Sequence, residues 1–175
     1  MRAFVAVELP KEVKDELYRI QKLINPSLAK IKWVPKKNIH LTLKFIGEVK
    51  DLKEIHEKLS KIKFNLFQVK LGEFGSFPSW EDMRVFWINL VPPKNIIKLQ
   101  QAVDVELLKF SDRQDFSPHL TLGRIKVIKR EKEFMKLIKS IEVKPIKFNV
   151  SEFKLMQSKL SKDGSKFITL KKYKA

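Results

Sequence analysis

A repeated tetrapeptide is the feature that most limits how this chain can fold. His40-Leu41-Thr42-Leu43 recurs as His119-Leu120-Thr121-Leu122, so two of the chain's three histidines lie in the same local context. Average residue usage predicts such a second copy on the order of once in a thousand chains. Side chains alternate faces along a strand, so each copy places its His and Thr on one face, roughly 6.5–7 Å apart, and its leucines on the other. The repeat therefore indicates a duplicated unit whose strands bury leucine and present an imidazole and a hydroxyl.

Apolar periodicity predicts a similar order of strands and helices in the two halves. Helical spacing recurs in four segments, which begin near Pro10, Asp51, Ile96 and Glu131. Strands are predicted for 2–8, 31–34, 39–46, 66–74, 84–90, 119–127, 142–160 and 166–173. Several strands between helices favour an α+β fold with antiparallel sheets over a doubly wound parallel sheet. Since no linker interrupts the pattern, residues 1–175 are expected to form a single domain of two duplicated lobes, each contributing one HxTx motif.

Composition narrows the classes of partner and cofactor. The chain has 37 Lys and Arg against 20 Asp and Glu, a formal net charge of +17, which favours a nucleic-acid partner over a merely solvated basic surface. The absence of Cys excludes a disulfide scaffold, a thiolate zinc site, an iron–sulfur cluster and a cysteine nucleophile. No apolar run approaches the roughly 20 residues of a membrane span. We therefore expect a cytoplasmic protein with no membrane partner, and nothing demands more than a monomer.

Two imidazoles and two hydroxyls suit phosphodiester chemistry without a metal. Imidazole titrates near neutrality, so one histidine can act as a base while the other acts as an acid. A Thr hydroxyl can donate a hydrogen bond to a phosphate oxygen. A two-histidine zinc site is the alternative, but no HExxH-like helix supplies a third ligand. No phosphate-binding loop of the P-loop type is present either, and neither a metal nor a cofactor is expected.

Four segments carry a resemblance to a known superfamily. They are the opening 2–10, the first motif with its flanks 33–49, the second motif 117–124 and the C-terminal segment 155–165. Together they resemble the 2H phosphoesterase superfamily, named for its two HxTx motifs. The closer similarity is to its 2′-5′ RNA ligase branch, also described as RNA 2′,3′-cyclic phosphodiesterases. The similarity extends over nearly the whole chain.

The resemblance implies a fold, an activity and catalytic roles. The implied fold is bilobal and α+β, with two pseudo-symmetric antiparallel sheets flanked by helices around a central cleft. The implied activity is hydrolysis of RNA 2′,3′-cyclic phosphate ends, tRNA fragments among them, to 2′-phosphomonoesters, with reversible 2′-5′ ligation and no cofactor. In this family's scheme His40 is the proton donor and His119 the proton acceptor, with Thr42 and Thr121 beside them. The two copies are nearly identical, so sequence alone does not order these roles.

A second set of side chains near the motifs is predicted to bind substrate: Arg124, Phe45, Trp33, Lys44, Phe77 and Arg84. Arg124 would neutralise a phosphate, although strict alternation places it opposite His119 unless a bulge turns it back. Phe45, Trp33 and Phe77 would stack on bases or line the RNA path, with core packing as the alternative. Lys44 and the neighbouring Lys36 and Lys37 would hold phosphates and make binding salt-sensitive.

Two other functions compete with this hypothesis. A non-catalytic RNA-binding module would use the His-Thr faces only to grip a phosphate, but it would not require two titrating imidazoles. A 2H phosphodiesterase could instead act on a small cyclic-phosphate nucleotide or a 2′-5′ oligonucleotide. The high positive charge favours a long polyanion over a mononucleotide.

Overall fold

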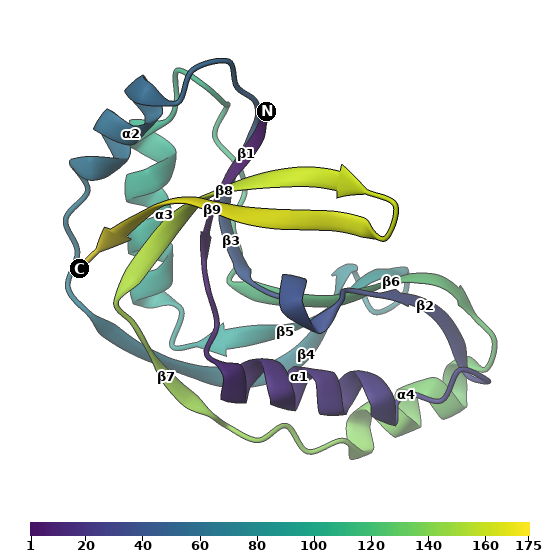
Figure 1. Ribbon diagram of the computed structural model, residues 1–175. Coiled ribbons are helices and arrows are strands. Elements are labelled where there is room, and N and C mark those ends of the chain that lie inside the picture. The colour runs from purple at the N-terminus through teal and green to yellow at the C-terminus, as the bar shows by residue number, and fades with distance from the viewer.

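The computed structural model describes all residues 1–175 and consists of two antiparallel sheets and four α-helices (Figure 1). The strands are β1 (Arg2–Val7), β2 (Ala29–Trp33), β3 (Leu41–Glu48), β4 (Phe67–Pro78), β5 (Met83–Val91), β6 (His119–Ile128), β7 (Lys147–Val150), β8 (Glu152–Ser161) and β9 (Gly164–Lys174). The helices are α1 (Lys11–Leu23), α2 (Lys53–Ser60), α3 (Lys94–Glu106) and α4 (Glu131–Ser140), with a short 3-10 turn η1 at Lys36–Asn38. The expected α+β class with antiparallel sheets is confirmed.

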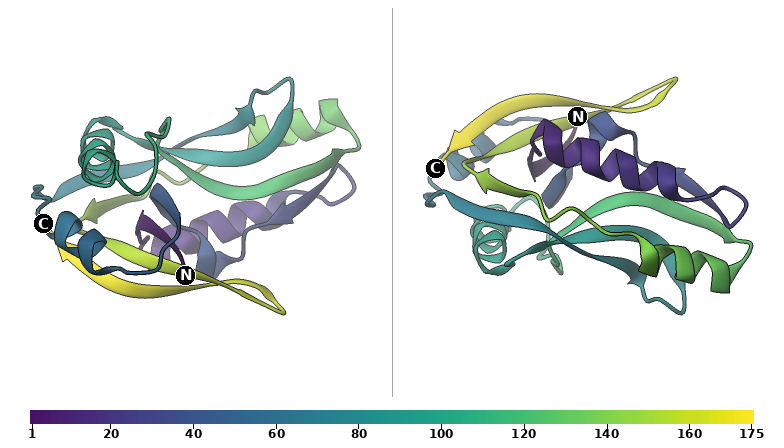
Figure 2. Two further views of the ribbon diagram at one scale, coloured as in Figure 1. Left: turned by 90° about the horizontal axis from the view of Figure 1, so that it is seen from above. Right: turned by 90° about the horizontal axis from the view of Figure 1, so that it is seen from below.

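Each sheet takes strands from both ends of the chain. The four-stranded sheet has the order β3-β1-β8-β9, and the five-stranded sheet has the order β2-β6-β5-β4-β7. Figure 2 shows them as two layers, with the β8–β9 hairpin in one and β5 and β6 in the other. The stretch 142–160, predicted from one alternating pattern, divides at Ser151, where the chain leaves one sheet (β7) and enters the other (β8). The strand β7 buries alternate residues, whereas β8 buries the four consecutive residues Phe153, Lys154, Leu155 and Met156.

The helices cover the leucine-bearing faces of the sheets. On α1, Gln21 donates hydrogen bonds to the backbone oxygens of Val34 and Leu122, which fixes this helix against β6. On α4, Phe134 packs against Phe86 of β5. The other two helices, α2 and α3, contact each other and pack on the four-stranded sheet at β9 and β3. Each sheet therefore has one face buried under a pair of helices.

One continuous apolar core of 36 buried residues joins both sheets and all four helices. Val13, Leu17 and Ile20 of α1 are fully buried, as their helical spacing predicts. The motif leucines are buried too: Leu41 and Leu43 on β3, and Leu120 and Leu122 on β6. No helix has the length and apolar character needed to cross a bilayer.

Candidate active site

The two HxTx motifs lie one on each sheet. His40 directly precedes β3, and His119 is the first residue of β6. Both histidines and both motif threonines are half-buried, whereas the leucines between them are buried. The structure therefore realises the alternation predicted from the tetrapeptide, with the imidazole and hydroxyl on the face away from the helices.

The two imidazoles are held in the same way. His40 Nδ1 lies 2.6 Å from the backbone oxygen of Asn38, and His119 Nδ1 lies 2.7 Å from that of Ser117. A carbonyl oxygen only accepts hydrogen bonds, so Nδ1 carries the proton and donates it in both rings. The neutral ring then has an unprotonated Nε2, and that nitrogen is the one available for chemistry. His40 Nε2 also lies 2.9 Å from the Thr42 hydroxyl oxygen.

Aromatic side chains enclose each imidazole. His40 stacks on Phe4, with ring centroids 5.1 Å apart, and meets the edge of Phe167 at 5.0 Å. His119 meets Phe77 at 4.9 Å and Trp87 at 5.9 Å. Rings packed this closely restrict the imidazoles to one orientation and displace water from them.

This enclosure lowers the pKa of both histidines. Burial disfavours the imidazolium and lowers each pKa below the usual 6.5, and the hydrogen bond to Asn38 or Ser117 offsets part of that effect. For His40, the Lys14 ammonium lowers the pKa further and the Glu8 carboxylate raises it. Both rings are therefore neutral near pH 7 in the free protein, and a bound phosphate would favour the protonated form.

A bulge follows each motif and turns the fifth residue after the histidine onto the histidine face. On β6 the register with β5 shifts between Thr121 and Gly123, so that Thr121 pairs with Trp87 and Arg124 with Val85. Residues paired across a ladder share a face, and Trp87 and Val85 are two apart on β5. Arg124 therefore lies on the same face as His119 and Thr121, as the proposed bulge requires.

The same shift occurs after the first motif. Thr42 pairs with Ala6 of β1 and Phe45 pairs with Phe4, which places the exposed ring of Phe45 on the face of Thr42. Its ring centroid lies 6.3 Å from that of Phe4. Phe45 and Arg124 are thus structurally matched positions at the two motifs.

Two of the predicted substrate contacts lie on the face opposite the histidines. Lys44, which pairs with Val5 of β1 just after the first bulge, points into the core, where it is 1% exposed and its ammonium pairs with Asp104 and donates to the backbone oxygen of Asp112 at 2.8 Å. Trp33 pairs with Gly123 and packs against the buried Phe86, so its ring lies on the core side of β2. In both cases the register of the strand decides on which face of the sheet the side chain lies, and closeness to the motif in sequence does not.

The other predicted contacts have different surroundings. Phe77 is in direct contact with His119, whereas Arg84 is exposed and pairs with Asp82. The aromatic neighbours Phe4, Phe167 and Trp87 were missed by the sequence reasoning. Trp87 could have been found, because its strand lies next to the second motif in an antiparallel sheet. Phe4 and Phe167 come from opposite ends of the chain, and no local signal joins them.

Two links hold the motifs in a fixed relation. Val34, just before η1 and the first motif, donates its backbone N–H to the Leu122 oxygen of the second motif at 2.9 Å. Beyond the first motif, the side-chain amide of Gln114 binds both the N–H and the C=O of Phe45, at 3.1 and 2.8 Å. Gln114 belongs to the segment that leads into His119, so each motif is tied to the flank of the other.

Comparisons with known proteins agree with this geometry. The family model described as LigT like Phosphoesterase matches residues 7–87 and 89–167. An RNA 2′,3′-cyclic phosphodiesterase of Thermotoga maritima is 36% identical over 171 residues, covering 94% of this chain and 90% of that protein. One of Methanothermobacter thermautotrophicus is 32% identical over 171 residues, covering 94% and 93%.

Solved structures give the same fold. The crystal structure of TT0787 of Thermus thermophilus matches with a TM-score of 0.79 at 25% identity, covering 99% of this chain and 97% of that one. Apo LigT of Escherichia coli matches with a TM-score of 0.79 at 24% identity, covering 99% and 96%. The resemblance inferred from the motifs is confirmed: with the family model matched in two segments and an HxTx strand on each sheet, this chain belongs to the LigT-like phosphoesterases of the 2H superfamily.

Proposed function

We propose that this protein hydrolyses RNA 2′,3′-cyclic phosphate ends to 2′-phosphomonoesters by two-histidine acid–base catalysis. The observation that carries the proposal is the matched pair of imidazoles, each with Nδ1 fixed by a backbone carbonyl and with an unprotonated Nε2 that can take up a proton. A binding module would need donors only, and it would gain nothing from two rings in the same tautomer. The relatives named RNA 2′,3′-cyclic phosphodiesterase support this choice of reaction.

In the proposed reaction His119 is the base and His40 the acid. His119 Nε2 takes a proton from water, and the resulting hydroxide oxygen forms a bond to phosphorus. The bond between phosphorus and the ribose 3′-oxygen breaks, and protonated His40 gives its Nε2 proton to that oxygen. One water is consumed, and the products are a 2′-phosphate and a 3′-hydroxyl. The same steps with an RNA 5′-hydroxyl in place of water would form a 2′-5′ linkage and leave a free 3′-hydroxyl.

The neighbouring side chains would stabilise the charge that develops on phosphate. The hydroxyls of Thr42 and Thr121 share the faces of the histidines and would donate to non-bridging oxygens. Arg124, exposed and turned onto the same face as His119, would neutralise one of those oxygens. The negative phosphate would also raise the pKa of His40 and so load the acid with its proton.

Product analysis tests the proposal directly. A short RNA ending in 2′,3′-cyclic phosphate is incubated with the protein in excess EDTA, and the terminal phosphate of the product is identified. The expected product is a 2′-phosphate, formed without metal. His40→Ala and His119→Ala should each lose orders of magnitude in rate while circular dichroism shows an unchanged fold.

Other outcomes would favour the alternatives. Tight binding of an RNA that stays intact would indicate a binding module. Hydrolysis confined to small cyclic nucleotides would indicate a phosphodiesterase whose substrate is a mononucleotide. Normal turnover by both histidine variants would refute the mechanism. We further propose that the enzyme acts as a cytoplasmic monomer of one duplicated domain, and that tRNA fragments are among its substrates.

A further inference from the structure

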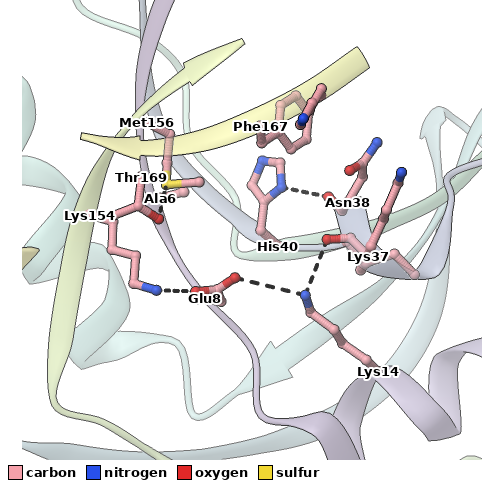
Figure 3. A pocket seen from close by; sticks show the side chains of 12 residues that line it. Ala6, Glu8, Lys14, Lys37, Asn38, His40, Lys154, Met156, Phe167 and Thr169 are labelled. Atoms are coloured by element: carbon pink, nitrogen blue, oxygen red, sulfur yellow. Dashed lines mark hydrogen bonds and ion pairs between the residues drawn. The ribbon is translucent and has the colours of Figure 1, made fainter. Parts of the chain in front are cut away.

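A basic cavity of about 230 Å³ opens beside His40, on the same face of the four-stranded sheet (Figure 3). Its floor continues the face of Thr42: Ala6 pairs with Thr42 on one side and with Lys154 on the other, so all three side chains point the same way. Met156 and Thr169, a further cross-strand pair, extend this floor to β9. The cavity is therefore contiguous with the proposed catalytic face and shares His40 with it.

Four lysines and one glutamate line the cavity, which gives it a formal charge of +3. Lys14 and Lys154 reach Glu8 from two sides and occupy both of its oxygens. Their ammoniums are largely buried, with side chains 16% and 9% exposed, so this ion-paired cluster is a fixed part of the wall. Glu8 is consequently already neutralised and does not repel an incoming anion.

The other two lysines have no acidic partner. Lys37 on η1 and Lys166 on β9 are exposed, and neither forms an ion pair in the structure. They line the cavity from different elements, and His40 and Phe167, which meet edge to face, line it as well. Two ammoniums without an acidic partner at the lining of a cavity of this size fit a tetrahedral anion better than a neutral base.

We propose that this cavity binds the phosphate on the 5′ side of the nucleotide whose cyclic phosphate reacts, with Lys37 and Lys166 as its ligands. The proposal rests on the proposed function, because it takes the reacting phosphate to lie at His40 and Thr42. The next phosphate of an RNA chain is then one nucleotide away, and the cavity is the adjoining basic space on that face. Substrates carrying this second phosphate should therefore be preferred over nucleoside 2′,3′-cyclic monophosphates.

The test compares kcat/KM for substrates with and without the second phosphate. The value of kcat/KM is measured for a nucleoside 2′,3′-cyclic phosphate, for the same compound carrying a 5′-phosphate, and for a dinucleotide with an internal phosphodiester. The wild type should prefer both phosphorylated substrates. Lys37→Gln and Lys166→Gln should each reduce that preference by about fivefold, the limit for one partly exposed ion pair, and the double variant by more.

Lys162→Gln is the matched control. Lys162 lies in the exposed turn of the β8–β9 hairpin, outside the cavity, and carries the same charge. Its substitution should leave the substrate ratio unchanged, whereas a general loss of positive charge would lower the ratio in all variants equally and overturn the proposal. A preference for the 5′-phosphate alone would contradict recognition of an internal phosphate, and a preference for both substrates supports it.

A binding measurement separates this proposal from the proposed function. The affinities of a nucleoside 2′-monophosphate and of the corresponding 2′,5′-bisphosphate are compared by calorimetry, which needs no turnover. Tighter binding of the bisphosphate that depends on Lys37 and Lys166 supports the cavity even if no substrate is hydrolysed. Equal affinities, or an advantage that survives the double variant, overturn it even if hydrolysis is fast.

Discussion

Replacing Lys44 by Met should destabilise the fold far more than replacing a lysine of the protein surface. The Lys44 side chain is 0% exposed and that of its partner Asp104 is 9% exposed, so the variant leaves a carboxylate buried without its counter-ion. Removing one partner of a buried pair costs about 3–5 kcal/mol. A chain of this size has a total stability of about 5–15 kcal/mol, so the loss is a large fraction of it.

The assay is urea denaturation followed by circular dichroism, supported by thermal melts. The expected loss corresponds to a fall in Tm of roughly 6–20 °C for a domain of this length. Lys109→Met is the matched control, because Lys109 pairs with Glu54 at the surface, with side chains 67% and 44% exposed. An exposed pair contributes about 0–1 kcal/mol, so this variant should be nearly as stable as the wild type.

A second variant distinguishes loss of the ion pair from loss of packing. Lys44→Met combined with Asp104→Leu removes both charges and should regain most of the lost stability, because no uncompensated carboxylate remains. The reasoning is refuted if Lys44→Met loses no more than Lys109→Met, or if the double variant is as unstable as the single one.

Three further predictions concern the site. Because burial holds the pKa of His40 and His119 below 6.5, the unfolded chain takes up protons first as the pH falls. The free energy of unfolding should therefore decline as the pH drops through 6.5 towards the folded pKa values; urea midpoints that do not change with pH would contradict this. Thr42→Val should lower kcat by roughly 10–10³-fold with little change in fold, measured on cyclic-phosphate RNA. Gly75→Ala should cost about 1–3 kcal/mol in denaturation, since its Cβ would lie 2.0 Å from the Trp87 ring.

Sequence patterning was sufficient for the order of most strands and helices and for the face on which each motif histidine lies. The spacing of Val13, Leu17 and Ile20 defined the buried stripe of α1, and the HxTx alternation indicated the faces of β3 and β6. Both signals are local, since they depend only on the helical or extended repeat of a short segment. The repeat also revealed that two similar strands would bring their imidazoles to matched positions.

Distance along the sequence did not predict which face of a strand a side chain occupies, because the register of the strands decides that face. Lys44 lies next to Phe45 on a chain of net charge +17, and nothing local distinguishes a lysine that binds phosphate from one that pairs with Asp104. The partner lies sixty residues away on α3 and becomes its neighbour only when that helix packs on β3. The cavity beside His40 could not be predicted locally either, because its walls come from η1, α1, β1 and the β8–β9 hairpin, which are distant in sequence.

The same type of bulge occurs in both motif strands, but the residues that follow it differ in charge and polarity. In each ladder the register skips the second leucine of the motif, Leu43 or Leu122, so that the following residue faces the core and the next one returns to the histidine face. In the first copy these two residues are Lys44 and Phe45, and in the second they are Gly123 and Arg124. The motifs themselves are identical and cannot order the roles of the histidines, whereas the flanks differ: an apolar ring follows His40 and a guanidinium follows His119. The only positive charge that the two bulges add to the histidine faces is therefore on the His119 side, and the residues that break the symmetry of the two copies are those that follow the bulges.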